Sequence, residues 1–242
     1  MPEPSPPIQT RLTDVLTRLK NALPLANRPD NPAAPILLAV SKTQPTEAIA
    51  ALAAAGQHAF GENYVQEALP KIEALQTLAL EWHLIGHLQS NKAHEAARAF
   101  DWIQTIDRAK LIPLLARHRP SELPPLNVLV QVNVDDEASK HGCAPADAMA
   151  LADLITTEPR LQLRGLMAIP APNENPQQSA QAFHAMRDLF DAMRQHHSGI
   201  DTLSMGMSGD FVAAIEQGAT MVRIGSALFG SRVTPQFKES KA

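Results

Sequence analysis

The 242-residue sequence has a single cysteine, Cys143, and only one tyrosine, Tyr64. One cysteine excludes a disulfide within the chain and a cysteine-rich metal site, and this usage is typical of the reducing cytosol. No apolar run approaches the roughly 20 residues that a membrane-spanning helix needs. The proline-rich N-terminus also lacks the basic and apolar regions of a signal peptide. We therefore expect a cytoplasmic protein with no membrane contact.

Long runs of one charge are missing as well. The net charge is −4, so nothing favours nucleic acid or an anionic membrane as a partner. A hydrophobic content of 45% and a charged content of 19% suit a soluble globular fold with a sizeable core. The sequence has no internal repeat at a fixed period and no low-complexity stretch beyond the N-terminal prolines, so no second domain is assigned.

What the sequence does contain is an alternation of short apolar runs with amphipathic segments. Residues 1–7 are proline-rich and expected to be frayed, 8–23 read as an amphipathic helix, and 27–35 form a connector. After the connector, strands are predicted at 36–41, 58–61, 82–86, 101–106, 127–134, 163–169, 202–206 and 221–225. Helices are predicted at 46–55, 63–77, 89–99, 108–118, 145–157, 176–196 and 209–217.

These elements make eight strand–helix units whose connections are too long for hairpins, so the sheet should be parallel. Eight such units in about 200 residues predict a single (β/α)8 TIM barrel with an extra N-terminal helix, filling 1–242 as one domain. The alternative is a doubly wound open sheet. That fold usually carries a Gly-x-Gly-x-x-Gly turn after its first strand, where this chain has Ser-Lys-Thr-Gln-Pro at 41–45.

Lys42 ends the first apolar run, and its primary amine is the most informative single group in the chain. A buried ammonium without a partner costs several kcal/mol. A lysine removed from water more readily presents a neutral amine, which attacks an aldehyde to form a Schiff base. Taken alone, a solvated lysine at a strand end is the more common explanation.

The ends of the last two strands change that preference. In many barrels the loops after these strands form a phosphate site, because small residues let backbone N–H groups approach an anion. Ser208 and Ser226, each beside a glycine, supply hydroxyls and amides there, and Arg223 lies inside the last strand. A permanent guanidinium at that position needs a partner such as a ring nitrogen or a carboxylate. Pyridoxal 5'-phosphate (PLP) combines an aldehyde, a phosphate and a pyridine nitrogen.

Six motifs then follow one another in register. They read AVSKT at 39–43, FGENYVQE at 60–67, WHLIG with QSNK within 82–92, GLMAIP at 165–170, LSMGMS at 203–208 and MVRIG at 221–225. Over roughly 36–232 the chain resembles the pyridoxal phosphate homeostasis protein family. The resemblance implies the barrel of the alanine racemase N-terminal domain, with PLP held on a lysine as a Schiff base.

The resemblance also implies the site residues. Lys42 would carry PLP, Asn63 would line the ring pocket, and Arg223 would face the pyridine nitrogen. One departure is Gln44, where many members have a second lysine, and it weakens the idea of a two-lysine relay. The phosphate would be held by Ser208, Gly225 and Ser226, and the full predicted cofactor-binding set is Lys42, Asn63, Met167, Ser204, Ser208, Arg223, Gly225 and Ser226.

The family resemblance implies that the protein binds and supplies PLP and balances vitamin B6 and amino-acid pools, without an established reaction. PLP-dependent apo-enzymes would be the recipients. The alternative is a PLP-dependent amino-acid racemase. A charged arginine leaves the pyridine nitrogen unprotonated, which disfavours transamination and tolerates racemisation. The resemblance implies that a racemase takes a second base, a tyrosine, from a β-domain of a partner subunit. No such domain follows the last strand, so a non-catalytic monomer is expected.

Weaker signals remain open. A third interpretation is a class I aldolase-type barrel, although by fold analogy its lysine would more often lie on a later strand. His83 and His87 are four residues apart, and a polar role on the barrel rim is favoured over zinc, so no metal site is predicted. Tyr64 is expected either to line the pocket or to pack against a helix. Lys140 is a candidate to accept the cofactor from Lys42 by transimination.

Overall fold

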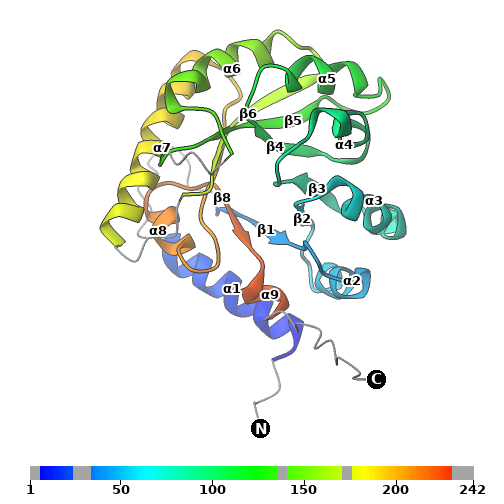
Figure 1. Ribbon diagram of the computed structural model, residues 1–242. Helices are drawn as coiled ribbons and strands as arrows, with labels where there is room; N and C mark the ends of the chain where they lie inside the picture. The colour runs from blue at the N-terminus through cyan, green and yellow to red at the C-terminus, as the bar shows by residue number, and fades with distance from the viewer. Residues whose placement is uncertain (1–5, 24–33, 136–140, 171–175, 231–242) are drawn as a thin grey trace, which may run out of the picture.

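The computed structural model describes residues 6–23, 34–135, 141–170 and 176–230. Eight parallel strands pair in chain order, and the last pairs with the first to close a barrel. The predicted (β/α)8 barrel is confirmed, and the open doubly wound sheet is wrong (Figure 1). The strands are β1 (Ile36–Val40), β2 (Ala59–Glu62), β3 (Glu81–Leu84), β4 (Trp102–Ile106), β5 (Leu126–Val132), β6 (Leu161–Ala168), β7 (Thr202–Ser204) and β8 (Met221–Ile224).

Helices connect the strands on the outside of the barrel. Their ends fall within three residues of the predicted ones when the short 3-10 turns are included. No helix within the described ranges is both long and apolar enough to cross a bilayer. The helices are α1 (Ile8–Ala22), α2 (Thr46–Ala54), α3 (Val65–Ala74), α4 (Ala93–Ala99), α5 (Leu111–His118), α6 (Ala148–Thr156), α7 (Pro176–His196), α8 (Phe211–Glu216) and α9 (Ser226–Phe229), with 3-10 turns η2 (Gln76–Leu78), η3 (Ser90–Lys92) and η4 (Pro145–Asp147).

The strands are buried on both faces, and alternate residues belong to different cores. Leu37 and Ala39 join the large cluster between sheet and helices, whereas Leu38 belongs to a small separate cluster. Met167 likewise packs with Trp102 in a small cluster of its own. Since successive side chains of a strand point to opposite faces, the small clusters fill the inside of the barrel.

Helix α1 covers the side of the barrel where the chain closes. It lies along α8 and α9 (Figure 1), burying Leu12, Val15 and Leu19. Arg11 Nε donates a hydrogen bond of 2.6 Å to the carbonyl oxygen of Leu228 in α9. The extra N-terminal helix is therefore part of the barrel's packing and lies beneath the loops that follow β7 and β8.

Candidate functional site

A cavity of about 480 Å³ opens at the carboxyl ends of β1, β2 and β8. Polar groups line one side of it, and Ile85, Ile169 and Met207 supply apolar surface that sequence reasoning missed, although each follows a strand end. The cavity brings together six of the eight predicted residues: Lys42, Asn63, Ser208, Arg223, Gly225 and Ser226.

Lys42 lies directly after β1, is half-buried, and lines this cavity. Within the described residues, its ammonium has no hydrogen-bond or ion-pair partner. Its neighbours in the chain are held firmly by contrast. The hydroxyl of Ser41 donates to Glu62 Oε1 at 2.6 Å, and the backbone N–H of Thr43 donates to Glu67 Oε1 at 2.5 Å. The backbone that carries Lys42 is thus fixed while its amine stays available.

A second lysine organises these contacts. Lys71 Nζ donates to Glu62 Oε1 at 2.9 Å, to Glu67 Oε1 at 2.7 Å and to the carbonyl oxygen of Ser41 at 3.0 Å. Thr43 has φ +63°, a left-handed backbone conformation that is uncommon for a residue other than glycine. Such a conformation persists only where its surroundings hold it. The ion pairs of Lys71 therefore hold the turn that presents Lys42.

Glu62 is fully buried, and burial raises the pKa of its carboxyl above 4.5, although Ser41 and Lys71 work in the opposite direction. Its Oε2 atom is buried and has no hydrogen-bond partner among the described residues. Sequence reasoning missed this group of charges. Glu67 and Lys71 are four apart on α3, and that spacing is typical of a solvated surface pair.

Arg223 projects from β8 and is almost completely buried. Its guanidinium donates to the hydroxyl oxygen of Ser204 at 2.8 Å and to the carbonyl oxygen of Ala168 at 2.7 Å. Burial lowers the pKa of Arg223 to about 10, which leaves the group charged at neutral pH. The cavity wall therefore carries a positioned cation.

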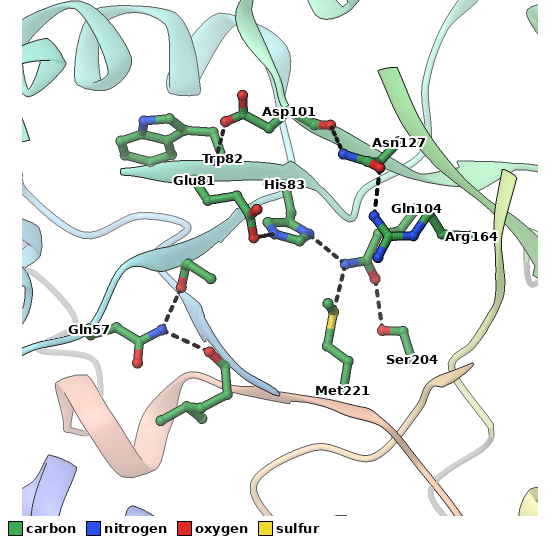
Figure 2. Close-up of polar contacts among 12 residues, drawn as sticks. Gln57, Glu81, Trp82, His83, Asp101, Gln104, Asn127, Arg164, Ser204 and Met221 are labelled. Atoms are coloured by element: carbon green, nitrogen blue, oxygen red, sulfur yellow. Dashed lines mark hydrogen bonds and ion pairs between the residues drawn. The ribbon is translucent and has the colours of Figure 1, made fainter. Parts of the chain in front are cut away.

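A chain of hydrogen bonds runs from Arg223 across the barrel interior, and Figure 2 shows the part from Ser204 onward. The Ser204 hydroxyl donates to Gln104 Oε1 at 2.8 Å, and Gln104 Nε2 donates to His83 Nδ1 at 2.9 Å. His83 Nε2 then lies 2.8 Å from Glu81 Oε1. Because Gln104 offers His83 a donor, the proton of a neutral imidazole belongs on Nε2, and it points at Glu81. Burial lowers the pKa of His83, consistent with a neutral ring.

Two of the eight predicted residues lie behind the cavity instead of on its lining. Ser204 is fully buried between Arg223 and Gln104, and Met167 is fully buried against Trp102 and Leu129. Their side chains can support the cavity wall from within the barrel. A contact of either residue with a cofactor stays a prediction.

The loops after β7 and β8 border the cavity as expected for an anion site. The turn at 207–209 precedes α8, which begins at Phe211 instead of the predicted residue 209. Asp210 fixes this turn by accepting a 2.6 Å hydrogen bond from the backbone N–H of Met207. Among the described residues, the N–H groups of Ser208 and Gly209 meet no acceptor, and a Cβ on Gly209 would find nothing within 4 Å. The turn therefore offers free donors beside open space.

The weaker signals are resolved differently. β3 ends at Leu84, so His83 and His87 do not share a strand face: His83 lies inside the barrel and His87 lies on the following loop. The rim role predicted for His83 is wrong. Tyr64 is 64% exposed and borders a second cavity, and it does not belong to the lining of the first cavity. Lys140 lies outside the described residues, and its proposed transfer role stays a hypothesis.

Comparison with known proteins places this geometry in a family. Residues 20–233 match the family model described as alanine racemase, N-terminal domain. The pyridoxal phosphate homeostasis protein of Haemophilus influenzae is 49% identical over 229 residues, covering 93% of this chain and 96% of that protein.

Solved structures of similar fold support the same family. The structure of PipY from Synechococcus elongatus, with PLP bound, has a TM-score of 0.79 and 35% identity, covering 93% of this chain and all of that one. Alanine racemase from Corynebacterium glutamicum, at 16% identity and a TM-score of 0.66, shows the same fold over 96% of this chain and 64% of that one. The chain belongs to the pyridoxal phosphate homeostasis protein family, built on the alanine racemase N-terminal barrel.

Proposed function

We propose that this protein binds PLP in the first cavity, attaches it covalently at Lys42, and serves PLP homeostasis without a catalytic turnover of its own. One observation carries the proposal. A lysine amine without a partner among the described residues shares a cavity with a buried guanidinium and with free hydroxyl and amide donors. The names of the relatives and the PLP in PipY support it.

The residues present fit PLP by chemistry and by space. When bound, PLP supplies an aldehyde that condenses with a primary amine. Lys42 is the amine on the cavity wall, and a volume of about 480 Å³ is ordinary for a cofactor pocket. The phosphate would be held by Ser208, Gly225 and Ser226 with their neighbouring amides. Asn63 would lie beside the ring.

Arg223 is the group that favours holding over turnover. A guanidinium that stays charged can donate to the pyridine nitrogen but cannot lend it a proton. The ring is then a weak electron sink, as the sequence predicted. Ser204 would act through Arg223, because its hydroxyl oxygen accepts a hydrogen bond from the guanidinium and its O–H donates one to Gln104 Oε1. Met167 would support the same wall by packing.

The proposed wider role rests on the resemblance to the family. The recipients would be PLP-dependent apo-enzymes, and the protein would work in the cytoplasm as a monomer. The naming of its bacterial relatives as homeostasis proteins supports a carrier of vitamin B6 over an enzyme. Transfer of PLP from the loaded protein to an apo-enzyme, measured by the activity that appears, tests the recipient class directly.

The central experiment is borohydride reduction of the PLP-loaded protein followed by peptide mass spectrometry. We expect a phosphopyridoxyl group on Lys42, with an absorbance band that Lys42→Ala abolishes. Lys110→Ala is the matched control, since Lys110 is an exposed lysine outside the cavity lining. A colourless protein that cannot be reconstituted with PLP would overturn the binding, and a label on another lysine would overturn the assignment of Lys42.

A further inference from the structure

Three side chains with metal-ligating atoms converge on the same rim of the barrel, outside the cavity described above. They are His87, Asp107 and His141, and their ligand atoms all lie within 4.8 Å of one another. Each comes from a different loop, after β3, β4 and β5 respectively. Nothing in the proposed binding of PLP uses any of them.

The backbone places His141 firmly. The loop that follows β5 returns to that strand, where the N–H of Cys143 donates to the carbonyl of Gln131 at 2.9 Å. Gln131 Nε2 also donates to the carbonyl oxygen of His141 at 3.2 Å. Gly142 has φ +125°, and a Cβ there would lie 2.6 Å from the backbone nitrogen of Asn133, so the close return needs glycine. His141 is thus held at this position by the strand itself.

The three groups contact one another by ring stacking and by one polar contact. The rings of His87 and His141 stack with centroids 3.9 Å apart, and His87 Nδ1 lies 3.4 Å from Asp107 Oδ2. Zinc bound at about 2.0–2.1 Å places its tetrahedral ligand atoms roughly 3.3 Å apart. The two rings are 17° from parallel, so their in-plane lone pairs do not meet at one point, and binding a single ion requires one of these exposed imidazoles to rotate.

Asp107 supplies the carboxylate of this cluster. The side chain of Asp107 is only 9% exposed. Arg108 donates to its Oδ1 atom at 2.5 Å, which leaves Oδ2 directed at His87. Two imidazole nitrogens and one carboxylate oxygen are a ligand set that zinc commonly uses.

A second cavity, of about 380 Å³, lies against this cluster. His87 and His141 border it together with Tyr64, Gln89 and Lys92. It also shares Asn63 with the first cavity. Catalytic and binding zinc sites keep three protein ligands and leave one position for water or another ligand. The second cavity provides room for that fourth ligand.

We propose that His87, Asp107 and His141 form a three-ligand site for a divalent cation of the zinc class, with its open position facing the second cavity. The sequence alone predicted no metal site, because His141 lies far from His87 in the chain and only the barrel brings them together. The proposal is independent of the role of Lys42.

The test is a titration of the PLP-loaded, chelator-stripped protein with ZnCl₂ against a chromophoric chelator. We expect one site of micromolar affinity or tighter. His87→Ala, His141→Ala and Asp107→Asn should each weaken it at least tenfold, of the order seen when metal-site groups are removed. Cobalt(II) should give the intense visible absorbance of low-coordinate sites in the wild type and not in these three variants.

The matched control is the double variant His94→Ala/His118→Ala. These two imidazoles also pair, at 5.1 Å between ring centroids, but they are not part of the cluster. We expect it to bind zinc as the wild type does. Thermal melting without metal checks that the variants fold, since His87 and His141 are exposed. Equal zinc affinity in the wild type and all three single variants would overturn the site, as would loss of binding only in the control.

Discussion

Two lysines at one end of the barrel differ in what surrounds them. Lys71 is buried and contacts two carboxylates and a carbonyl oxygen, whereas Lys42, half-buried, contacts none among the described residues. A buried charge that loses its partner leaves the other charge uncompensated. We therefore expect Lys71 to stabilise the site and Lys42 to react with the ligand.

The contrast predicts the effect of Lys71→Met. Glu62 would remain buried without its cation, so we expect the free energy of unfolding to fall by about 3–5 kcal/mol, measured by urea denaturation. Lys92→Met is the control, because its pair with Glu95 is 3.8 Å long and partly exposed. Removing such a surface pair should change stability by less than about 1 kcal/mol. Equal losses in the two variants would contradict a structural role for Lys71.

The buried imidazole of His83 predicts a dependence of stability on pH. Its pKa is lowered by burial in the folded protein, whereas the unfolded chain titrates near 6.5. The unfolded state then binds more protons as the pH falls below 6.5, so stability is intact above that value and is lost down to the folded pKa. The slope from this one group reaches about 1.4 kcal/mol per pH unit.

Urea denaturation between pH 7.5 and 5 measures that slope. We expect His83→Gln to flatten it, since glutamine does not titrate and retains polar atoms for Gln104 and Glu81. His184→Gln is the control, because the side chain of His184 is 64% exposed. An unchanged slope in His83→Gln would show that other groups cause the loss of stability at acid pH.

At the scale of elements, the segment after β3 passes very close to the backbone that follows β2. Gly86, after β3, passes so close to Asn63, after β2, that a Cβ would lie 2.0 Å from the Asn63 carbonyl oxygen. This contact sets the position of Asn63, which borders both cavities. The absence of a side chain at one residue thereby shapes two binding spaces.

Gly86→Ala should therefore displace the Asn63 loop. We expect a stability loss of about 1–3 kcal/mol, typical of overpacking, together with weaker PLP binding by fluorescence titration. Gly209→Ala is the control for stability, because a Cβ there meets nothing within 4 Å. A substitution into open space should change stability by no more than about 0.5 kcal/mol. Wild-type stability in Gly86→Ala would refute the close contact.

The elements were more predictable than the contacts inside them. Buried parallel strands read as apolar runs with polar ends, so all eight were found, and their chain order implied the barrel. The interior chain was not found, because Gln104 and His83 sit in apolar strands and nothing local says that they face each other. The same holds for His87 and His141, which only the closed sheet brings together. Met167 and Ser204 were assigned by motif, and their depth behind the wall required coordinates.

At the scale of the whole molecule, α1 joins the beginning of the described chain to its last helix. It packs along α8 and α9, and Arg18 lies 4.5 Å from the ring centroid of Phe211 in α8. The loops proposed to hold phosphate begin these two helices. The buried apolar stripe of α1 therefore supports the two helices that follow the proposed phosphate-binding loops.

Leu19→Ala tests this support. Leu19 is 4% exposed, so its truncation should lower the free energy of unfolding by about 2–5 kcal/mol. Leu16→Ala, on the same helix, is the control, because Leu16 is 47% exposed and should change stability by no more than about 0.5 kcal/mol. Chemical denaturation monitored by circular dichroism measures both. A small loss in Leu19→Ala would show that α1 is dispensable to the barrel.

The turn at Thr43 has a consequence for how fast a ligand can leave. Both residues beside Lys42 are held by the Lys71 ion pairs, so the amine moves only by rotations within its own four-carbon side chain. Such rotations take picoseconds to nanoseconds, whereas rearrangement of a backbone loop takes microseconds or longer. Release at Lys42 should then be timed by the making and breaking of its covalent bond, with no slower opening motion of the turn in front of it.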